Sequence, residues 1–323
     1  MGPLVSVIIA SYNSSGFIIE TLDSILNQTW QEKELIITDD CSKDNTVEIC
    51  KAWLNDHKAD FRNTLLIEAN KNTGVPANVN RGVMASSGEW IKILGADDTL
   101  KTDCLENNIR EVSSNPAIRV LFSRVEVFRD TFEQGNLISI IPGDPFNPEG
   151  IMSPGRDAVS QYKMLLVCDR IHYSPSLFIH KETLASVGAF DERFKILEDH
   201  PLWLNLTKSG IKLHFMDTVT VNYRQHSGAI NNTGETQIIN PNYLKNNEFR
   251  KAYTYPYLPA DVRMDQIFTW KVSRIFNIRM FNKNTRFNRF LFSMLTIYLN
   301  PFRYFIRLKR LVGTDIRNDE FYK

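Results

Sequence analysis

Two pairs of adjacent carboxylates are the residues of this chain whose type and spacing most clearly predict chemistry. Asp39 and Asp40 follow one strand-like apolar run, and Asp97 and Asp98 follow another. Placing an unpaired charge at a strand end that packs into a core is costly, so such pairs predict a bound cation or a hydrogen-bonding ligand. Carboxylate oxygens are hard ligands that suit Mg²⁺ or Mn²⁺, and these ions keep coordination positions for phosphate oxygens.

Other phosphate-binding chemistries lack their defining residues here. The chain has neither GxGxxG after its first strand nor GxxxxGK[ST], which argues against a dinucleotide fold and a P-loop. A nucleotidyltransferase would also use acidic pairs of this kind, but it would need a glycine-rich basic loop after the first strand. Residues 11–16, SYNSSG, contain no cation. The absence of a basic loop therefore disfavours an enzyme that makes a nucleotide-sugar.

The elements that position these carboxylates follow from the apolar pattern. Residues 4–10, 34–38, 64–69 and 89–94 are short apolar runs typical of buried strands, and amphipathic helical patterns separate them. This alternation predicts an α/β fold with a mainly parallel open sheet and helices on both faces. Because ligands of such sheets bind beyond the carboxyl ends of the strands, both acidic pairs would lie at the binding edge.

Beyond residue 100 the pattern is less regular. Residues 118–128, 176–180 and 219–223 are expected strands, and the Gly/Pro-rich residues 141–155 form an expected loop. Glu198 and Asp199 precede an apolar run that begins at Trp203, which indicates a helix N-terminus there.

Several motifs occur in an order that resembles the family 2 glycosyltransferases with the GT-A fold. They cover the first hundred residues and resume near residue 188. The matching segments are SVIIASYN (6–13), IITDDCSKDNT (36–46), NTG (72–74), NVN (78–80), GEWI (88–91), ADD (96–98), GAFD (188–191), ED (198–199) and YRQH (223–226).

The resemblance implies roles on the donor side of a sugar-transfer site. Ser11, Tyr12 and Asn13 would line the nucleoside pocket. Asp40 would accept a hydrogen bond from the base, and Asp39 would support it.

It further implies how the diphosphate and metal are held. Asp97 would face the ribose or the sugar, and Asp98 would bind a Mn²⁺ or Mg²⁺ ion that bridges the diphosphate. Asn80 or Arg81 would contact the donor, and His226 would approach the metal or the diphosphate. Members of the family often carry DxDD after the fourth strand, whereas this chain has glycine at the first of those positions, residue 95.

On the acceptor side, the resemblance assigns Asp199 as the general base that deprotonates the acceptor hydroxyl, with Glu198 orienting the acceptor or the base. Displacement at the anomeric carbon needs one carboxylate on that side, and such a base contributes roughly 10²–10⁴-fold in rate. Two plainer interpretations stay open: Asp199 as a helix cap before Pro201, and His226 as a surface histidine.

The C-terminal part of the chain has a different composition. The formal net charge of the whole chain is +1, yet residues 266–313 contain no Asp or Glu and are rich in aromatic residues. The cations of this segment are Lys271, Arg274, Arg279, Lys283, Arg286, Arg289, Arg303, Arg307, Lys309 and Arg310. Basic helices rich in aromatic residues favour an anionic membrane surface. Packing on protein and binding to nucleic acid are the alternatives, and we expect no nucleic-acid partner.

Composition sets further bounds. The four cysteines are widely spaced without a CxxC pair, which indicates a reducing compartment. No signal-peptide pattern is visible, and no apolar stretch reaches the ~18 residues of a membrane span. We therefore expect a protein that lies peripherally on the cytoplasmic face of the membrane.

Together these features predict a GT-A catalytic domain over residues 1–230 and a basic, amphipathic helical extension over residues 231–323. The expected activity is inverting transfer of a hexosyl or N-acetylhexosaminyl group from a UDP-sugar. The expected acceptor is a saccharide or lipid-linked saccharide of cell-surface polysaccharide assembly. A catalytically idle nucleotide-sugar-binding scaffold is the alternative from another class, and the sequence leaves the oligomeric state open.

Overall fold

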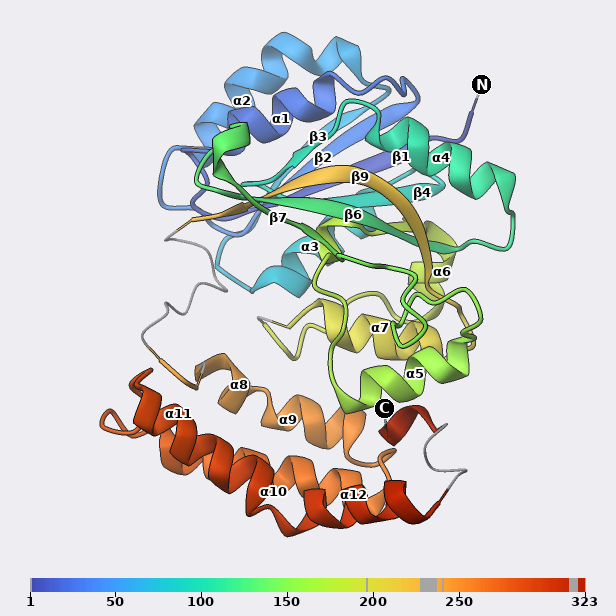
Figure 1. Cartoon of the computed structure of the whole chain (residues 1–323). Helices are drawn as coiled ribbons and strands as arrows, with labels where there is room; N and C mark the ends of the chain where they lie inside the picture. Colours follow the sequence, from blue (N-terminus) through green and yellow to red (C-terminus); the bar gives the residue numbers. More distant parts are fainter. Residues whose placement is uncertain (1, 196, 227–236, 240, 314–318, 323) are drawn as a thin grey trace. The chain divides into compact units, whose positions relative to one another are not determined.

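The computed structural model describes residues 2–195, 197–226, 237–239, 241–313 and 319–322 (Figure 1). The strands are β1 (Val5–Ser11), β2 (Lys33–Asp39), β3 (Thr64–Glu68), β4 (Trp90–Gly95), β5 (Thr99–Leu100), β6 (Val120–Arg129), β7 (Leu137–Ile141), β8 (Phe178–His180) and β9 (His214–Gln225). The α-helices are α1 (Ile18–Leu26), α2 (Thr46–His57), α3 (Val75–Ala85), α4 (Cys104–Ser114), α5 (Ala158–Val167), α6 (Lys181–Ser186), α7 (Asp199–Lys208), α8 (Pro241–Lys245), α9 (Asn247–Phe249), α10 (Ala260–Phe276), α11 (Arg286–Ser293) and α12 (Pro301–Val312). Single helical turns of other types lie at Lys58–Asp60, Gln134–Asn136, Ser174–Ser176, Arg250–Thr254, Met294–Tyr298 and Glu320–Tyr322.

All the strands belong to one sheet with the order β3-β2-β1-β4-β8-β6-β9-β5, and β7 pairs with β6 beside this path. Strands β3, β2, β1 and β4 are mutually parallel. Strand β8 joins β4 to β6 by antiparallel pairing, β9 runs parallel to β6, and β5 pairs antiparallel with β9. The sheet is therefore parallel in its first half and mixed in its second half.

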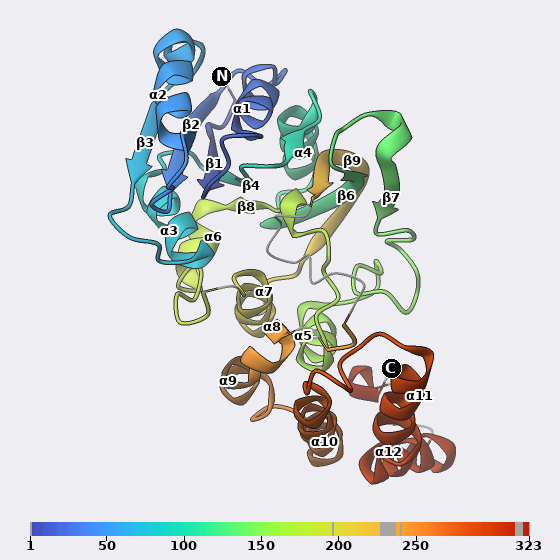
Figure 2. The ribbon, with the colours of Figure 1, turned by 90° about the vertical axis from the view of Figure 1, so that its left-hand side faces the viewer.

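Burial explains why the first four strands read as apolar runs. Val7, Ile8 and Ile9 of β1 and Leu35, Ile36 and Ile37 of β2 are completely buried. Helices α1 and α2 lie on one face of these strands, and α3 and α6 lie on the other (Figures 1 and 2). A sheet covered on both faces needs apolar side chains on both, and this is the pattern of the sequence.

The described chain divides into two compact units. One comprises residues 1–161 and 171–226, and the other comprises residues 162–170 and 227–323. The expected boundary at residue 230 lies outside the described residues. Residues 162–170, the second half of α5 and the loop after it, belong with the C-terminal helices. Within that unit, for example, the Gln266 side chain donates to the carbonyl oxygen of Val167 at 2.8 Å.

In the C-terminal unit, α10 and α12 pack against each other through ion pairs. Asp265 of α10 pairs with Arg303 of α12 at 3.0 Å, and Asp261 pairs with Lys309 at 2.7 Å. Within the described ranges, none of the helices combines the length and the apolar composition that crossing a bilayer requires.

Candidate active site

The predicted donor-side residues meet at one edge of the sheet because β1, β2 and β4 are parallel neighbours. In the strand register Ser11 lies beside Asp39, and Ala10 lies beside Gly95. The chain passes from β1 outward to β2 and β3 and then returns to β4 on the other side of β1. Strand order therefore reverses between β1 and β4, which is where open α/β sheets bind their ligands.

Asp39 is held rigidly at the end of β2. It is almost fully buried, and its carboxylate accepts hydrogen bonds from the Ser11 hydroxyl at 3.0 Å and from the backbone N–H and hydroxyl of Ser42 at 2.8 and 2.5 Å. With three donors on one carboxylate, Asp39 fixes the end of β1 and the loop after β2 relative to each other. Support for a bound base by Asp39 stays a prediction.

Tyr12 and Asn13 form the turn that leaves β1. Asn13 has a left-handed backbone with φ 52°, and its side-chain oxygen accepts a hydrogen bond from the backbone N–H of Lys43 at 2.7 Å. Tyr12 is 46% exposed and directly follows the buried Ser11. An exposed aromatic ring at the ligand-binding edge is suited to stack on a nucleobase.

Asp40 is bound by donors of the protein itself. Its two oxygens accept hydrogen bonds from the backbone N–H groups of Thr73 and Gly74, from the Thr73 hydroxyl and from the Arg81 guanidinium. Burial raises the pKa of Asp40, but the Arg81 ion pair and these hydrogen bonds outweigh burial and hold that pKa below its ordinary value. The predicted residues Asp40 and Arg81 are thus brought together as a buried ion pair at the start of α3.

Asn80 connects α3 to the segment that leads to the expected catalytic base. Its amide nitrogen donates to the carbonyl oxygen of Phe190 and to the Glu192 carboxylate, and its oxygen accepts from the Phe190 N–H. The backbone N–H of Val75 also donates to the carbonyl oxygen of Lys195 at 3.2 Å. Residues 190–195 are therefore fixed against the start and the middle of α3.

Glu198 and Asp199 follow this fixed segment. Glu198 immediately precedes α7, and Asp199 is its first residue. One Asp199 oxygen accepts a hydrogen bond from the backbone N–H of His200 at 2.7 Å. Negative charge in a first helical turn is stabilised by the N–H groups there, so both the helix-end interpretation and a role as base fit this position.

The second acidic pair lies just beyond β4. Asp98 is only 3% exposed, and its Oδ1 accepts a hydrogen bond from the backbone N–H of Arg224 at 2.9 Å. Burial, followed by repulsion from Asp97, raises the pKa of Asp98 well above its ordinary value, and Arg224 and Lys92 oppose that rise. His226 approaches the other carboxylate, with its Nε2 3.1 Å from Oδ2 of Asp97. The structure therefore gathers Asp97, Asp98 and His226 at one place.

Gly95 provides the space into which both carboxylates turn. A Cβ atom built on Gly95 would lie 2.8 Å from an Asp97 oxygen and 3.5 Å from an Asp98 oxygen. The departure from the family's DxDD pattern thus has a local consequence, since carboxylate oxygens occupy the room that a side chain at residue 95 would need.

Arg224 is the main site residue to which the sequence analysis gave no role. Its buried guanidinium donates to the backbone carbonyl oxygens of Asp97 and Asp130 and forms an ion pair with Glu20. Together with its backbone contact to Asp98, Arg224 fastens β9 and α1 to the loop that carries the acidic pair. Two features of the sequence point to this residue: Arg224 directly follows the alternating run 219–223, and it lies within the matching segment YRQH (223–226).

Aromatic rings surround this guanidinium. The Arg224 guanidinium carbon lies 4.0 Å from the ring centre of Phe132 and 4.9 Å from that of Phe17. The ring of Phe17 also contacts the His226 ring, with centres 4.7 Å apart. These contacts restrict where Arg224 and His226 can move, which keeps His226 beside Asp97.

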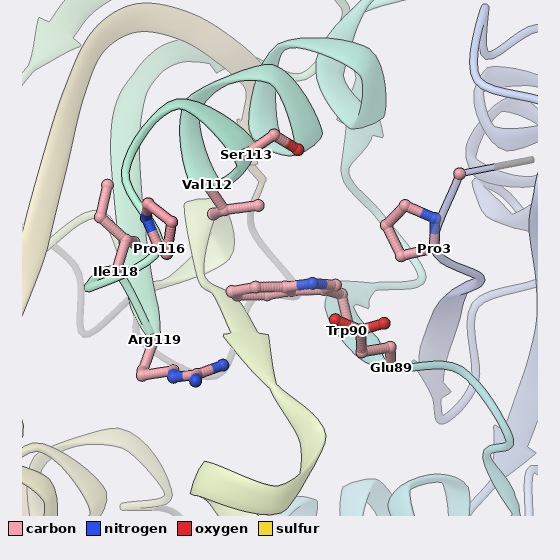
Figure 3. Close-up of a pocket in the computed structure, with 9 residues that line it drawn as sticks. Pro3, Glu89, Trp90, Val112, Ser113, Pro116, Ile118 and Arg119 are labelled. Atoms are coloured by element: carbon pink, nitrogen blue, oxygen red, sulfur yellow. The ribbon is translucent and has the colours of Figure 1, made fainter.

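A surface pocket of about 520 Å³ lies at the opposite end of the same strands (Figure 3). Pro3 lines it just before β1, Glu89 and Trp90 line it at the start of β4, and Arg119 lines it just before β6. None of the predicted site residues lines this pocket. The acidic edge and not this pocket is therefore the candidate active site.

Comparison with known proteins identifies the family of the chain. The model of the family described as "Glycosyl transferase family 2" matches residues 6–168, about half of the chain. The uncharacterized glycosyltransferase MJ1057 of Methanocaldococcus jannaschii is 27% identical over 92% of this chain and 88% of its own length. The Escherichia coli protein WfaP, named UDP-Glc:alpha-D-GlcNAc-diphosphoundecaprenol beta-1,3-glucosyltransferase, is 28% identical over 70% of this chain and 79% of its own length.

Among solved structures, S. aureus TarS 1-349 in complex with UDP-GlcNAc is similar with a TM-score of 0.59 and 15% identity, over 99% of this chain and 89% of that one. This likeness in fold confirms the predicted GT-A type architecture, an α/β sheet flanked by helices with a C-terminal helical part. The order of the sequence motifs, the family match and the fold agree, and the chain belongs to glycosyl transferase family 2.

Proposed function

We propose that the chain transfers a sugar from a UDP-sugar to a hydroxyl group of a saccharide or lipid-linked saccharide, with inversion at the anomeric carbon. The observation that carries the proposal is the gathering of Asp97, Asp98 and His226 beyond β4, next to the edge formed by Ser11 and Asp39. This places carboxylates for a diphosphate-bound cation beside a polar edge for a nucleoside.

On the donor side, Ser11, Tyr12 and Asn13 line the nucleoside pocket. The exposed Tyr12 ring faces the base, and the Asp39 carboxylate holds the turn in place through Ser11 and Ser42. Asp40 is buried, and its oxygens already accept hydrogen bonds from Thr73, Gly74 and Arg81, so it acts by holding the loop before α3 beside this pocket. Asn80 acts through the fixed segment 190–195, not by touching the donor.

The acidic pair fits a divalent cation. Two oxygens converge on the space above Gly95, and burial, followed by repulsion from Asp97, raises the pKa of Asp98, so a bound cation would stabilise its ionised form. The described residues contain no group of three or more acidic, His or Cys side chains arranged as a complete metal site. A Mg²⁺ or Mn²⁺ ion held by one or two carboxylates takes its other ligands from water and phosphate, so Asp98, with Asp97 and His226 beside it, would hold such an ion. Once bound, the ion supplies charge neutralisation for the departing diphosphate.

On the acceptor side, Asp199 accepts the proton of the attacking hydroxyl, and Glu198 orients the acceptor. The hydroxyl oxygen bonds to the anomeric carbon as the bond to the diphosphate breaks, so one displacement gives inversion. The base works from a fixed position because residues 190–195 are anchored to α3. A positioned base of this kind contributes roughly 10²–10⁴-fold in rate.

The names of relatives and neighbours support the choice of substrates. WfaP is named for transfer from UDP-glucose to a diphosphoundecaprenol-linked sugar, and TarS was solved with UDP-GlcNAc. We infer a hexosyl or N-acetylhexosaminyl transfer in cell-surface polysaccharide assembly, on the cytoplasmic face of the membrane.

A thermal-shift panel tests the donor and metal assignments. UDP, GDP, dTDP and CDP are compared with Mn²⁺, with Mg²⁺ and with a chelator. We expect UDP with metal to raise the melting temperature, because a ligand at ~100 times its dissociation constant adds about 2.7 kcal/mol. If UDP raises the melting temperature equally in the presence of chelator, the metal site is contradicted. If another nucleotide and not UDP raises the melting temperature, the assignment of UDP as the donor nucleotide is contradicted.

Product stereochemistry tests the mechanism. With a UDP-sugar that shifts the melting curve and a matching acceptor, NMR of the product is expected to show a β-linkage formed from the α-linked donor. Retention contradicts the assignment of Asp199 as base. Nucleotide binding without turnover, under conditions in which a related transferase works, identifies an idle scaffold instead.

A further inference from the structure

Helix α12 has two different faces, and one of them packs on α10 inside the C-terminal unit. The inner face packs on α10, where Arg303 and Lys309 pair with Asp265 and Asp261. The Phe302 ring adds an edge contact to that of Phe268. Helices α10 and α12 are drawn side by side in Figures 1 and 2, in agreement with these contacts.

The outer face of α12 is apolar and open. It consists of large side chains that are 52–81% exposed: Tyr304, Phe305, Leu308, Leu311 and Val312. The spacing i, i+4, i+7 and i+8 from Tyr304 to Val312 places them on one side of the helix. An exposed apolar helix face of this length is typical of a surface that binds a partner.

The same character continues outside α12. Phe287 and Phe290, one turn apart on α11, are 67% and 62% exposed, and Tyr298 and Leu299 of the following turn are also exposed. We call these four residues and the five outer residues of α12 the outer apolar surface. Its aromatic side chains are Phe287, Phe290, Tyr298, Tyr304 and Phe305.

Nine of the ten cations in residues 266–313 divide into two groups, and the tenth, Arg310, is half-buried. Arg303 and Lys309 are used in the ion pairs to α10. Seven others are exposed, and they are Lys271, Arg274, Arg279, Lys283, Arg286, Arg289 and Arg307. Arg307 lies on the outer side of α12, since it is three residues from Tyr304 and four from Leu311. Arg286 and Arg289 flank Phe287 and Phe290 in the same way. No carboxylate between residues 266 and 313 offsets this charge.

We propose that the outer apolar surface binds an anionic lipid bilayer, with its aromatic and aliphatic side chains in the interface and its cations at the headgroups. An apolar helix face with Lys and Arg at its border lies in the plane of such an interface. Each cation near an anionic leaflet adds to the attraction. Charge complementarity therefore identifies the occupant.

The same charge pattern disfavours a second copy of the chain. In a symmetric dimer the surface would face itself and bring like charges together, which costs free energy. The cores of protein interfaces are also depleted in charged residues, whereas cations alternate with aromatic residues along α11. Nucleic acid would leave the aliphatic residues Leu308, Leu311 and Val312 without a partner.

Vesicle co-sedimentation of the full chain tests the proposal. Vesicles of phosphatidylcholine alone are compared with vesicles of equal parts phosphatidylcholine and phosphatidylglycerol, without nucleotide. We expect binding to the anionic vesicles that weakens by tenfold or more when salt is raised from low to high. This readout is independent of sugar transfer, so its failure leaves the proposed function unaffected.

Paired variants locate the surface. Phe305→Ser with Leu308→Gln, and separately Arg286→Glu with Arg289→Glu, should each weaken partition by roughly tenfold or more. The matched controls are Met84→Gln and Lys58→Glu, exposed residues of the other unit, and these should bind as wild type does. Because all the changed side chains are exposed, melting curves should stay the same.

Three results would overturn the proposal. One is an absence of binding to anionic vesicles, and another is equal binding to neutral and anionic vesicles. The third is a dimer in sedimentation equilibrium that the Phe305→Ser, Leu308→Gln pair converts to a monomer, because a second copy would then cover the surface.

Discussion

At Asp98, function and stability have opposite requirements. Burial and repulsion from Asp97 raise the pKa of this carboxyl group, which means that its ionised form is unfavourable in the fold. A bound divalent cation would reverse that preference. A buried carboxylate that lowers the stability of the fold and lies just beyond a strand indicates a functional role, here the binding of a cation.

The substitution Asp98→Asn separates these two requirements. Asparagine keeps an oxygen that can accept the hydrogen bond from the Arg224 N–H but removes the charge. We expect an unchanged or higher melting temperature, loss of the metal-dependent UDP shift and a fall in kcat/KM of about 10²-fold or more. Thermal shift and a transfer assay measure these effects. Asp103→Asn, at an exposed aspartate before α4, is the control and should match wild type. A variant at Asp98 that keeps the metal-dependent shift contradicts the metal assignment.

Arg224 makes a different kind of contribution, because its contacts hold segments together. Arg224→Ala leaves the carbonyl oxygens of Asp97 and Asp130 without their buried donor. We expect the free energy of unfolding to fall by roughly 2 kcal/mol or more, measured by urea unfolding. Arg110→Ala removes an exposed helical arginine and should change it by less than about 0.5 kcal/mol. If Arg224→Ala and Arg110→Ala change the free energy of unfolding equally, the contacts of the Arg224 guanidinium add no stability.

At the scale of elements, the loop before α3 is held by the side chain of Asp40, which follows β2, and by that of Arg81 in α3 itself. Asp40 receives the N–H groups of Thr73 and Gly74 where α3 begins, and Gly74 has φ 93°, a conformation that a side chain would strain. A Cβ on Gly74 would also lie 2.8 Å from atoms of Lys195. The start of α3 is therefore the junction between the donor edge and the segment that leads to Asp199.

Asp40→Asn is expected to weaken that junction in a pH-dependent way. The pKa of Asp40 is lowered in the fold, so its ionised form adds stability that is fully present above the unfolded pKa, near 4. Urea unfolding should show a deficit of roughly 1–3 kcal/mol in the variant that is constant between about pH 5 and pH 7. The deficit should shrink as pH falls below about 4, through the folded pKa. A deficit that instead grows toward low pH would contradict the sign of this pKa shift.

The sequence predicted those elements that local pattern determines. The expected strands 34–38 and 89–94 correspond to β2 (33–39) and β4 (90–95), because buried parallel strands must be apolar on both faces. Residues 219–223 were expected as a short strand, whereas β9 extends over His214–Gln225. Its length depends on pairing with β6, a contact between distant residues that no local pattern records.

The site was predictable to a similar degree. The acidic pairs are visible because charge at a strand end is unusual. The ion pair of Asp40 with Arg81 and the hydrogen bond from Arg224 to the Asp97 carbonyl oxygen could not be predicted from the sequence, since they depend on which distant segments meet. Either Asn80 or Arg81 is expected at the donor, and the bonds from Asn80 to residues 190 and 192, more than a hundred positions away, could not be read from the local sequence.

At the scale of the whole molecule, the division into units does not follow chain order. Residues 162–170 belong with the helices after residue 227, although α5 itself begins in the first unit. Met164 and Leu165 are completely buried, and Lys163 pairs with Asp319 at 3.4 Å. A catalytic domain that ended at residue 230 would therefore lack partners for part of α5.

Deletion of residues 231–323 should accordingly destabilise the remainder. The buried apolar side chains of residues 162–170 would become exposed, and exposing apolar surface costs about 25 cal/mol per Å². We expect a lower midpoint of thermal unfolding by circular dichroism, together with aggregation. The full chain with Leu308→Gln, altered only at an exposed position, is the control and should melt as wild type does. An unchanged midpoint in the deletion would show that the first unit folds independently.

The placement of β9 also has a consequence during synthesis. This strand lies between β6 and β5, and it delivers Arg224 to an aspartate 126 residues earlier in the chain. Until residue 225 has left the ribosome, one edge of β6 has no partner and Asp98 lacks its backbone donor. An open strand edge can pair with other chains. During synthesis the nascent chain therefore has most of its sheet for a long interval, while the β9-facing edge of β6 is unpaired and the site around Asp98 is incomplete. A chaperone that covers this edge would be most useful in that interval.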